Sequence, residues 1–250
     1  MHAMNWQLPR LAPGDDFPPV SQALPALSPF PGLLAAGGRL DADTLERAYR
    51  RGIFPWFSPG EPVLWWSTDP RMVLRPAQLR VTRSLRQSAR RFMRNPDVQL
   101  RIDSAFSQVM QQCGAQRAAT GTWITEEMLR AYTDLHRRGL AHSFELWEGS
   151  RLRAGLYGVC IGRMFYGESM FTTVADGSKT LLMALCGLCL REGIEMIDCQ
   201  QQTDYLAQMG ATPIARADFL QHVEQTTSLP AVQSWQYDRD TFLTDCARWL

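Results

Sequence analysis

The chain has 250 residues, of which 45% are hydrophobic and 20% charged, and its formal net charge at pH 7 is +1. These proportions are those of an ordinary globular protein and argue against general disorder. No run of eighteen apolar residues occurs, so we expect no membrane span.

The N-terminus and the cysteines indicate the compartment. The first residues lack the basic stretch and apolar core of a secretory signal, and the six cysteines are scattered, so we expect a cytoplasmic protein with reduced thiols. Cys186 and Cys189 form a CxxC pair on a predicted helix, without a second pair beside them. Core packing is therefore favoured over a zinc or redox site, and we expect no bound metal.

Residues 1–31 predict an extended arm or an irregular wrapping segment, because they hold seven of the fifteen prolines and proline resists helices and central strands. The pattern Asp43-x-x-Glu46 is a capping box that predicts a short helix over residues 43–51, with Gly52 as its end. A strand is expected over residues 63–67.

Three tryptophans, Trp56, Trp65 and Trp66, lie within eleven residues. One interpretation is a small aromatic core that stabilises a small domain. The alternative is a stacking platform for a base or another planar ring.

Positive charge gathers in one segment of the chain. From Arg71 to Arg101 nine arginines stand against one acid, Asp97, which gives +8 and leaves −7 for the remainder of the chain. Within it, residues 83–94 predict an amphipathic helix with four arginines on one face. These arginines are Arg83, Arg86, Arg90 and Arg94. A solvated face is one interpretation, and a phosphate-bearing partner is the other.

The remaining two thirds of the chain predict an α+β domain with a mixed sheet. We expect a helix over 126–138, strands over 143–147, 152–160 and 164–171, a helix over 178–192, and a strand over 194–200. Shorter elements are expected over 204–209 and 213–215, followed by a helix from Asp218. Three antiparallel strands, a helix and a strand laid beside them form the order of the acetyltransferase-like (GNAT-like) fold.

Two of these strands carry polar side chains inside apolar sequence, which suggests a site because burying a carboxylate is costly unless it is paired or used. The strand period of two predicts that Tyr166, Glu168 and Met170 share one face. The same rule predicts a shared face for Met196, Asp198 and Gln200. If the strands are neighbours, Glu168, Asp198 and Gln200 line one cleft; the alternative is polar residues satisfied inside a sheet.

Five motifs occur together in an order that resembles the leucyl/phenylalanyl-tRNA–protein transferase family. They are Tyr49-Arg50-Arg51-Gly52-Ile53-Phe54-Pro55-Trp56, Trp65-Trp66-Ser67-Thr68-Asp69-Pro70-Arg71, Gly121-Thr122-Trp123-Ile124-Thr125, Gly167-Glu168-Ser169-Met170-Phe171 and Ile197-Asp198-Cys199-Gln200. The resemblance covers about residues 30–225. It implies a small N-terminal domain, residues 1–72, and an acetyltransferase-like catalytic domain, residues 73–250.

The resemblance also implies the reaction. Such an enzyme moves leucine, phenylalanine or methionine from aminoacyl-tRNA to a protein whose N-terminal residue is arginine or lysine, which marks that protein for degradation. It needs no cofactor, and we expect a monomer. The arginine face of residues 83–94 would then contact the tRNA backbone.

Site residues follow from the resemblance. It places Trp56, Trp123 and Tyr49 at the 3′ end of the tRNA. The aminoacyl pocket is expected to be formed by Phe165, Met170, Leu182, Leu185 and Ile197. Asp198, Gln200 and Glu168 are assigned to the transfer step, in which we expect Gln200 to orient the attacking amine while Asp198 and Glu168 hold the cationic acceptor.

Two other functions stay open. A coenzyme A-dependent N-acetyltransferase would share the fold, but the turn over residues 172–179 has one glycine and lacks the glycine-spaced pattern that holds the pyrophosphate. A non-catalytic tRNA-binding module would account for the arginines and tryptophans, but it would leave Glu168, Asp198 and Gln200 without a purpose.

Overall fold

The structure is a computed structural model that describes residues 7–117 and 124–250. Its strands are β1 (Arg10–Leu11), β2 (Leu33–Gly37), β3 (Phe54–Pro55), β4 (Leu64–Trp66), β5 (Arg71–Leu74), β6 (Val98–Ile102), β7 (Ala141–Glu148), β8 (Arg151–Ile161), β9 (Met164–Thr172), β10 (Ile197–Gln200) and β11 (Thr212–Ile214). Its helices are α1 (Ala42–Tyr49), α2 (Arg83–Arg94), α3 (Phe106–Arg117), α4 (Glu126–Arg137), α5 (Gly177–Glu192), α6 (Asp204–Gln208), α7 (Arg216–Thr227) and α8 (Arg239–Asp245).

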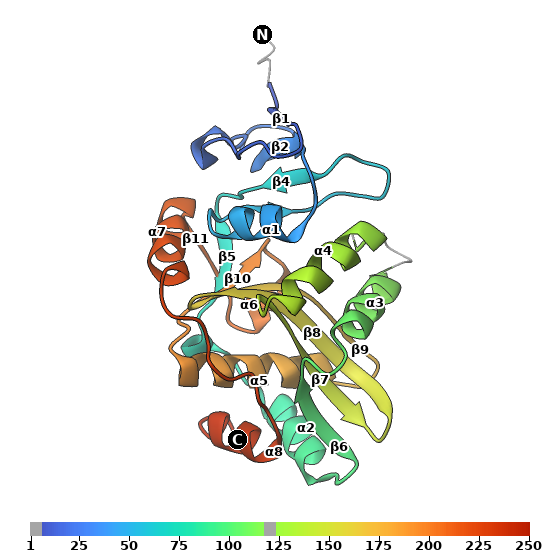
Figure 1. Ribbon diagram of the computed structural model, residues 1–250. Helices are drawn as coiled ribbons and strands as arrows, with labels where there is room; N and C mark the ends of the chain where they lie inside the picture. The colour runs from blue at the N-terminus through green and yellow to red at the C-terminus, as the bar shows by residue number, and fades with distance from the viewer. Residues whose placement is uncertain (1–6, 118–123) are drawn as a thin grey trace.

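Two sheets organise the described residues. A small sheet has the strand order β1-β2-β4-β3 and lies at the top of Figure 1 with the N-terminus. A larger sheet has the order β11-β5-β10-β9-β8-β7-β6, in which β9 and β10 are parallel and the other neighbours are antiparallel. The architecture is therefore a mixed α+β arrangement, as the sequence predicts.

The proline-rich arm packs on the small sheet and contributes strand β1 to it. Its described part also holds one short 3-10 helix, Val20–Gln22, and is otherwise irregular. Phe17 meets Trp65 edge to face, with ring centroids 4.8 Å apart. Arg51 donates to the carbonyl oxygens of Phe17 and Pro18 at 2.8 and 3.1 Å. Over the described part the arm is therefore an irregular segment that wraps the small sheet.

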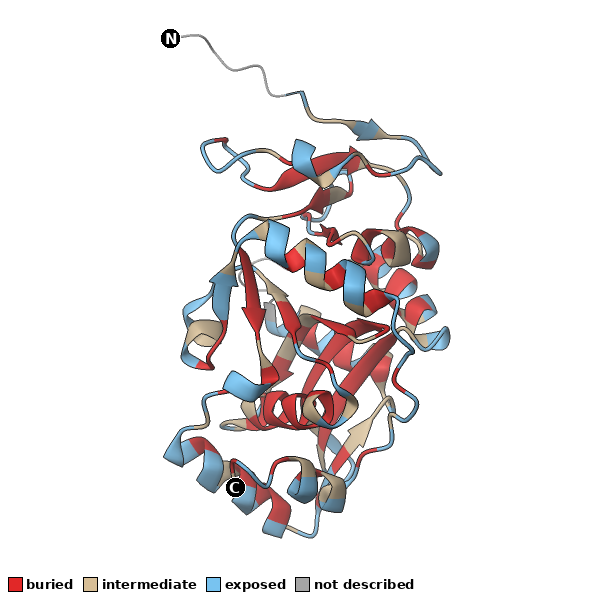
Figure 2. Cartoon of the chain, turned by 90° about the vertical axis from the view of Figure 1, so that its left-hand side faces the viewer, coloured by how far each residue is buried: buried red, intermediate tan, exposed pale blue. Residues whose placement is uncertain are grey.

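Helices cover both faces of the larger sheet, so two apolar cores form. On one face α2, α5 and α8 pack against residues such as Phe165 and Ile197. On the other face α1, α3, α4 and α7 pack against residues such as Tyr166 and Met196, and this core continues into the small sheet. Figure 2 shows the strands of the larger sheet and α5 as mostly buried.

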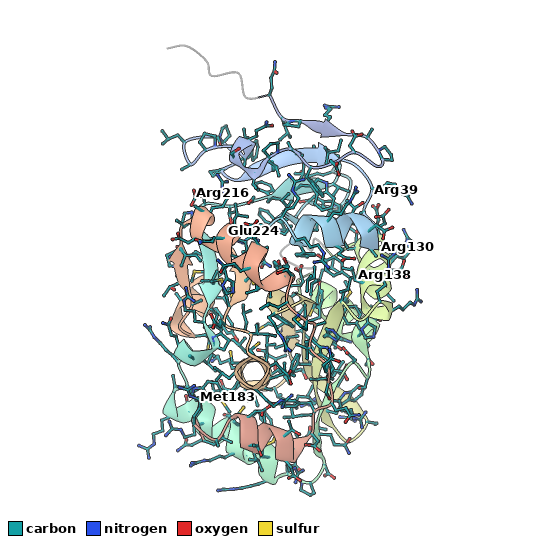
Figure 3. All side chains as sticks on the ribbon, turned by 60° about the vertical axis from the view of Figure 1, so that its left-hand side comes forward. Arg39, Arg130, Arg138, Met183, Arg216 and Glu224 are labelled. Atoms are coloured by element: carbon teal, nitrogen blue, oxygen red, sulfur yellow. The ribbon has the colours of Figure 1, made fainter. Side chains whose placement is uncertain are left out.

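Side chains at the outer surface join the elements. Arg138, labelled in Figure 3, donates from the end of α4 to Asp43 of α1 at 2.6 Å. Arg216 of α7, labelled in the same view, donates to the carbonyl oxygen of Ser67 at 2.7 Å. By contrast, Met183 on α5 is fully buried.

Most predicted elements are confirmed, with bounds that differ by a few residues. The helix over 83–94 begins and ends as predicted, because Thr82 caps it by accepting from the backbone N–H of Leu85. Five strands and two α-helices of the described chain were not predicted, namely β1, β2, β3, β5, β6, α3 and α8. For α3 a signal existed, since Phe106, Val109, Met110 and Cys113 recur at helical spacing on its buried face.

Candidate functional site

The site lies where the parallel strands β9 and β10 separate. The two strands pair only at Phe165 with Ile197 and at Tyr166 with Asp198. Beyond those pairs both strands are irregular: β9 shifts its register against β8 next to Glu168, and β10 shifts against β5 between Asp198 and Gln200. The strands therefore part and open a cavity between them.

The cavity has a volume of about 490 Å³ and extends from β9 and β10 to α5, α6 and the small sheet. Its wall is formed by Phe54, Pro55, Trp56, Leu156, Tyr157, Gly167, Glu168, Ser169, Met170, Ser178, Leu182, Leu185, Ile197, Cys199, Gln200, Gln201, Thr203, Tyr205 and Leu206. This size suits a small ligand group, and an apolar wall with a few polar side chains is typical of a binding site.

A β-bulge sets the direction of Glu168. Tyr157 of β8 pairs with Ser169 while the next pair joins Gly158 and Gly167, so Glu168 is the additional residue on β9. The bulge places Tyr166 and Met170 in opposite cores. The prediction that Tyr166, Glu168 and Met170 share one face is therefore wrong for Met170, because a bulge breaks the period of two.

Glu168 is only partly exposed at the cavity wall and accepts hydrogen bonds from two tyrosines. Tyr49 Oη donates to Oε1 at 2.5 Å and Tyr132 Oη to Oε2 at 3.1 Å. Burial raises the pKa of Glu168 to about 7, against the lowering effect of these two hydrogen bonds. The side chain is therefore poised between its neutral and charged forms near neutral pH.

Asp198 lies behind the cavity wall and is fully buried. Arg71, also fully buried, donates from Nε to Oδ1 at 2.8 Å and from Nη2 to Oδ2 at 2.6 Å. The backbone N–H of Gln200 donates to the same Oδ1 at 2.9 Å. The prediction that Asp198 lines the cleft is wrong, since its carboxylate lies in the core, where it forms an ion pair with Arg71.

Gln200 does line the cavity, and its backbone adopts an unusual conformation. Its φ is +56°, in the left-handed region that few residues other than glycine adopt. Asp198 accepts from its N–H, and the Thr68 hydroxyl donates to its carbonyl oxygen at 3.2 Å. Within the described chain its side-chain nitrogen Nε2 is buried without a hydrogen-bond partner. The left-handed turn also explains why the predicted shared face of Met196, Asp198 and Gln200 is wrong for Gln200.

Four of the five predicted pocket residues line the cavity. These are Met170, Leu182, Leu185 and Ile197. Phe165 instead lies fully buried in the core beneath α5, outside the cavity wall.

The predicted tRNA 3′-end residues occupy different positions. Trp56 lies at the cavity wall, is 42% exposed and packs on Trp66 with ring centroids 5.5 Å apart. Tyr49 is fully buried, with its hydroxyl on Glu168, so it offers no exposed ring for stacking. Trp123 lies outside the described residues.

The four predicted backbone-binding arginines are exposed on α2. Arg86 also donates to the carbonyl oxygen of Trp249 at 2.6 Å, which attaches the C-terminal segment to this helix. Ser88 on α2 donates at 2.8 Å to Asp176, the residue before α5. Since Ser178 of α5 lines the cavity, this contact connects α2 to the end of α5 that borders the site.

Two residues central to this arrangement were not predicted. Arg71 reaches Asp198 across 127 positions of the sequence, and no local pattern announces such a pair. Tyr132 left a weak signal, because it falls on the apolar face of a predicted helix beside Met128 and Leu135. A buried hydroxyl on such a face requires a polar partner.

The described part of the chain holds neither a cluster of metal-binding side chains nor a helix that could span a membrane. Within residues 7–117 and 124–250 no three side chains of His, Cys, Asp or Glu are grouped to hold a metal ion. In the same residues no helix combines the length and apolar character needed to cross a membrane.

Comparison with known proteins gives consistent results along the chain. A sequence model described as leucyl/phenylalanyl-tRNA protein transferase matches residues 73–224, and one for the N-terminal domain of that protein matches residues 38–69. The leucyl/phenylalanyl-tRNA–protein transferase of Cupriavidus metallidurans is 52% identical over 241 residues, which cover 96% of this chain and 95% of that protein. The protein of the same name from Leptothrix cholodnii is 53% identical over 224 residues, covering 89% and 88%.

Among solved structures, a conserved protein of unknown function from Bacteroides thetaiotaomicron is similar with a TM-score of 0.40 and 10% identity, over 68% of this chain and 58% of that one. This likeness is too remote to carry an argument. The acetyltransferase-like architecture therefore stays a prediction.

An apolar cavity with a carboxyl group and an amide at its wall, together with these matches, defines an enzyme of the aminoacyltransferase class. The chain belongs to the leucyl/phenylalanyl-tRNA–protein transferase family.

Proposed function

We propose that the enzyme transfers leucine, phenylalanine or methionine from aminoacyl-tRNA to the N-terminal arginine or lysine of an acceptor protein. The observation that carries this proposal is the cavity between β9 and β10, whose apolar wall meets Glu168 and Gln200. It offers an apolar group a buried position and offers an amine polar partners beside it.

The aminoacyl side chain would occupy the apolar part of the cavity, between Met170, Leu182 and Leu185. Methionine and leucine walls are deformable and accept unbranched, γ-branched and aromatic side chains. A pocket of this kind excludes β-branched and charged side chains by shape and desolvation, whereas one methylene group contributes only about 1–3 kcal/mol to discrimination.

The tRNA would contact two exposed features. Trp56 presents an exposed ring at the cavity wall, suited to stacking on the terminal adenine. The arginines of α2 present positive charge to the phosphate backbone. Trp123, which the resemblance places beside Trp56, belongs to the same proposal.

The chemistry is aminolysis of an ester that is already activated. A free α-amine has a pKa of about 8, so a modest fraction is neutral at pH 7. The enzyme must position that amine and remove its proton. We assign the orientation of the amine to the side-chain amide of Gln200, and to Asp198 the role of fixing Gln200 from behind the wall.

The wider organisation is proposed on similar grounds. Residues 1–72 are assigned to a small N-terminal domain and residues 73–250 to an acetyltransferase-like catalytic domain. The separate sheets support two domains, and the parting of β9 from β10 supports the second assignment. Since β5 begins at Arg71 and belongs to the larger sheet, the sheets favour a boundary just before Arg71. The enzyme would act as a monomer, and it would act in the cytoplasm, where charged tRNA is found.

Transfer of radiolabelled amino acid tests the function. Leucyl-tRNA and valyl-tRNA are each incubated with the enzyme and with peptides that begin with arginine or glycine. The expected result is transfer of leucine to the arginine peptide only. Binding of tRNA without transfer would favour the non-catalytic module, and acetylation of a peptide by acetyl-coenzyme A would favour the acetyltransferase.

A further inference from the structure

The hydroxyl groups of two tyrosines and the carboxyl group of Glu168 meet at the rear of the cavity wall. They come from three separate elements, since Tyr49 belongs to α1, Tyr132 to α4 and Glu168 to β9. Tyr49 Oη is 2.5 Å from Oε1 and Tyr132 Oη is 3.1 Å from Oε2, and the two phenol oxygens are in short contact with each other. The three groups therefore form a closed triangle of hydrogen-bonding contacts. Both tyrosines are fully buried.

The three groups of the triangle can share one proton more than they hold when Glu168 is ionised. Each phenol supplies one proton and an ionised carboxylate supplies none, so two protons serve three contacts. One contact is then left with lone pairs facing each other. When Glu168 takes up a proton, it donates to Tyr132, Tyr132 donates to Tyr49, and Tyr49 donates to Glu168. The triangle therefore has a place for one additional proton.

We propose that Glu168 is the proton acceptor of the aminolysis step and that Tyr49 and Tyr132 are positioning residues that hold it in this role. This inference rests on the aminoacyl transfer proposed above. It assigns Tyr49 to the carboxyl group instead of the tRNA 3′ end, and it adds Tyr132 to the site.

Attack of the neutral α-amine on the ester carbonyl breaks the C=O π bond and gives a tetrahedral intermediate with a positively charged nitrogen and a negatively charged oxygen. One N–H bond breaks, its electron pair stays on nitrogen, and the proton moves to Glu168. A lone pair of the negatively charged oxygen then re-forms the C=O bond while the bond from the carbonyl carbon to the ribose oxygen breaks, and the ribose oxygen leaves with the bonding pair. It receives the proton from Glu168, which returns to the carboxylate form.

The surroundings of Glu168 support an acceptor that works near neutral pH. The charged and titratable groups that face it are Tyr49 of α1, Tyr132 of α4, Tyr157 of β8, Asp198 of β10 and Arg71 of β5. Asp198 and Arg71 act in opposite directions and are paired with each other. Burial raises the pKa values of Tyr49 and Tyr132 well above the ordinary range, so both stay protonated donors.

The other polar groups of the site are less suited to accept this proton. Asp198 lies outside the cavity wall, and both of its oxygens accept from the Arg71 guanidinium, a cation that favours the ionised carboxylate and so opposes uptake of a proton. The side-chain oxygen of Gln200 belongs to an amide, which is a weak base. Glu168 alone among these three residues combines a carboxyl group with a place at the cavity wall.

Infrared spectroscopy tests the triangle in the free enzyme, independently of turnover. The carboxyl band of Glu168 is assigned by its absence in Glu168→Gln, and its intensity is followed against pH. The midpoint is expected at about 7. Tyr132→Phe or Tyr49→Phe removes a donor to the ionised form and is expected to move the midpoint to higher pH.

Tyr166→Phe is the matched control. Tyr166 is also fully buried and donates at 2.7 Å, but its acceptor is the backbone carbonyl of Tyr49. This variant loses a buried tyrosine hydroxyl while the triangle keeps its three members, so the midpoint should stay where it is in the wild type.

Single-turnover transfer of leucine from leucyl-tRNA to an arginine peptide, at pH 6 to 8, tests the role in the reaction. Glu168→Gln is expected to lose about a hundredfold or more at every pH. Tyr132→Phe is expected to lose about tenfold at pH 6 and to recover toward the wild-type rate at pH 8, with Tyr49→Phe as the second variant. Tyr166→Phe should retain the wild-type pH profile.

Two results would overturn this proposal alone, and a third would overturn the proposed function as well. If the wild type transfers leucine and Glu168→Gln keeps more than about a tenth of its rate, this proposal alone is overturned, and a ribose hydroxyl becomes the better proton carrier. The proposal would also be overturned if Tyr132→Phe shifted the pH midpoint of the carboxyl band but left the pH profile of the transfer rate unchanged. A wild type that transfers nothing would overturn the proposed function and this proposal with it.

Discussion

Arg71 and Asp198 form a bidentate ion pair in which neither side chain is exposed to solvent. The guanidinium also donates to the carbonyl oxygen of Gly52 at 3.2 Å and lies between the rings of Phe54 and Phe219. One side chain thus joins the small sheet, the larger sheet and α7 directly behind the cavity. Through Asp198 the same pair fixes the backbone of Gln200.

Arg71→Leu should destabilise the protein strongly, because it leaves the Asp198 carboxylate buried without a partner. We expect a loss of about 3–5 kcal/mol in the free energy of unfolding, measured by urea denaturation. Arg137→Leu provides the comparison, because both side chains of the pair of Arg137 and Asp134 are more than half exposed and such pairs contribute about 1 kcal/mol or less. Equal losses in the two variants would contradict the structural role of Arg71.

Gln200→Ala should reduce transfer by more than about tenfold while leaving stability nearly unchanged. The reason is that Nε2 has no hydrogen-bond partner in the described chain, so truncating the side chain removes no hydrogen bond of Nε2 from the fold, whereas the proposed orientation of the amine requires it. Single-turnover rates and thermal unfolding measure the two effects. Gln201→Ala is the control, since Gln201 lines the same cavity one position later. A loss smaller than tenfold for Gln200→Ala would make its orienting role minor.

Leu185→Ala should change the choice of amino acid. Leu185 lines the cavity, so truncation enlarges it and should raise the ratio of phenylalanine to leucine transfer, by an amount worth about 1–3 kcal/mol. Competition between the two charged tRNAs measures the ratio. Leu181→Ala, in the same helix but outside the cavity wall, should cost about 2–5 kcal/mol of stability without changing the ratio. If Leu181→Ala moves the ratio as much, the pocket is wrongly assigned.

Stability should fall as the pH rises from 4.5 toward 7, because burial raises the pKa of Glu168 from its ordinary 4.5 to about 7. In that range the folded protein binds more protons than the unfolded chain, so the free energy of unfolding decreases with pH. The effect is at most about 3 kcal/mol, and smaller because water reaches the cavity side of the carboxyl group. Urea unfolding at several pH values should show it in the wild type and not in Glu168→Gln. Glu127→Gln, an exposed position on α4, should behave as the wild type does.

Arg90→Gln should weaken binding of aminoacyl-tRNA and reduce the slope of log affinity against log salt by about one. The reason is that each arginine on a phosphate releases roughly one counterion. Titrations at several salt concentrations measure the slope. Arg10→Gln, exposed on β1 at the opposite end of the molecule from α2 (Figure 1), should leave it unchanged. Equal slopes for all three proteins would remove α2 from the tRNA surface.

The local elements of this protein were predictable because their signals are local. Thr82 and Thr125 cap α2 and α4 through their own side chains, and glycines end α4 and α5. The hairpin of β7 and β8 follows from alternating apolar residues around a turn. The composition of the cavity wall was largely predictable as well, since the motif residues Glu168 and Gln200 and the pocket leucines line it.

The direction of each polar side chain was decided by the tertiary structure. The bulge at Glu168 depends on pairing with β8, and the left-handed turn at Gln200 depends on Asp198 and on Thr68, which is 132 positions away. The charged partner of Asp198 lies 127 positions away, and the two tyrosine partners of Glu168 lie 119 and 36 positions away. A repeat of two residues along a strand carries no information about such contacts. They arise only when the small sheet, α4 and the larger sheet pack together and leave each buried charge the partners that its desolvation requires.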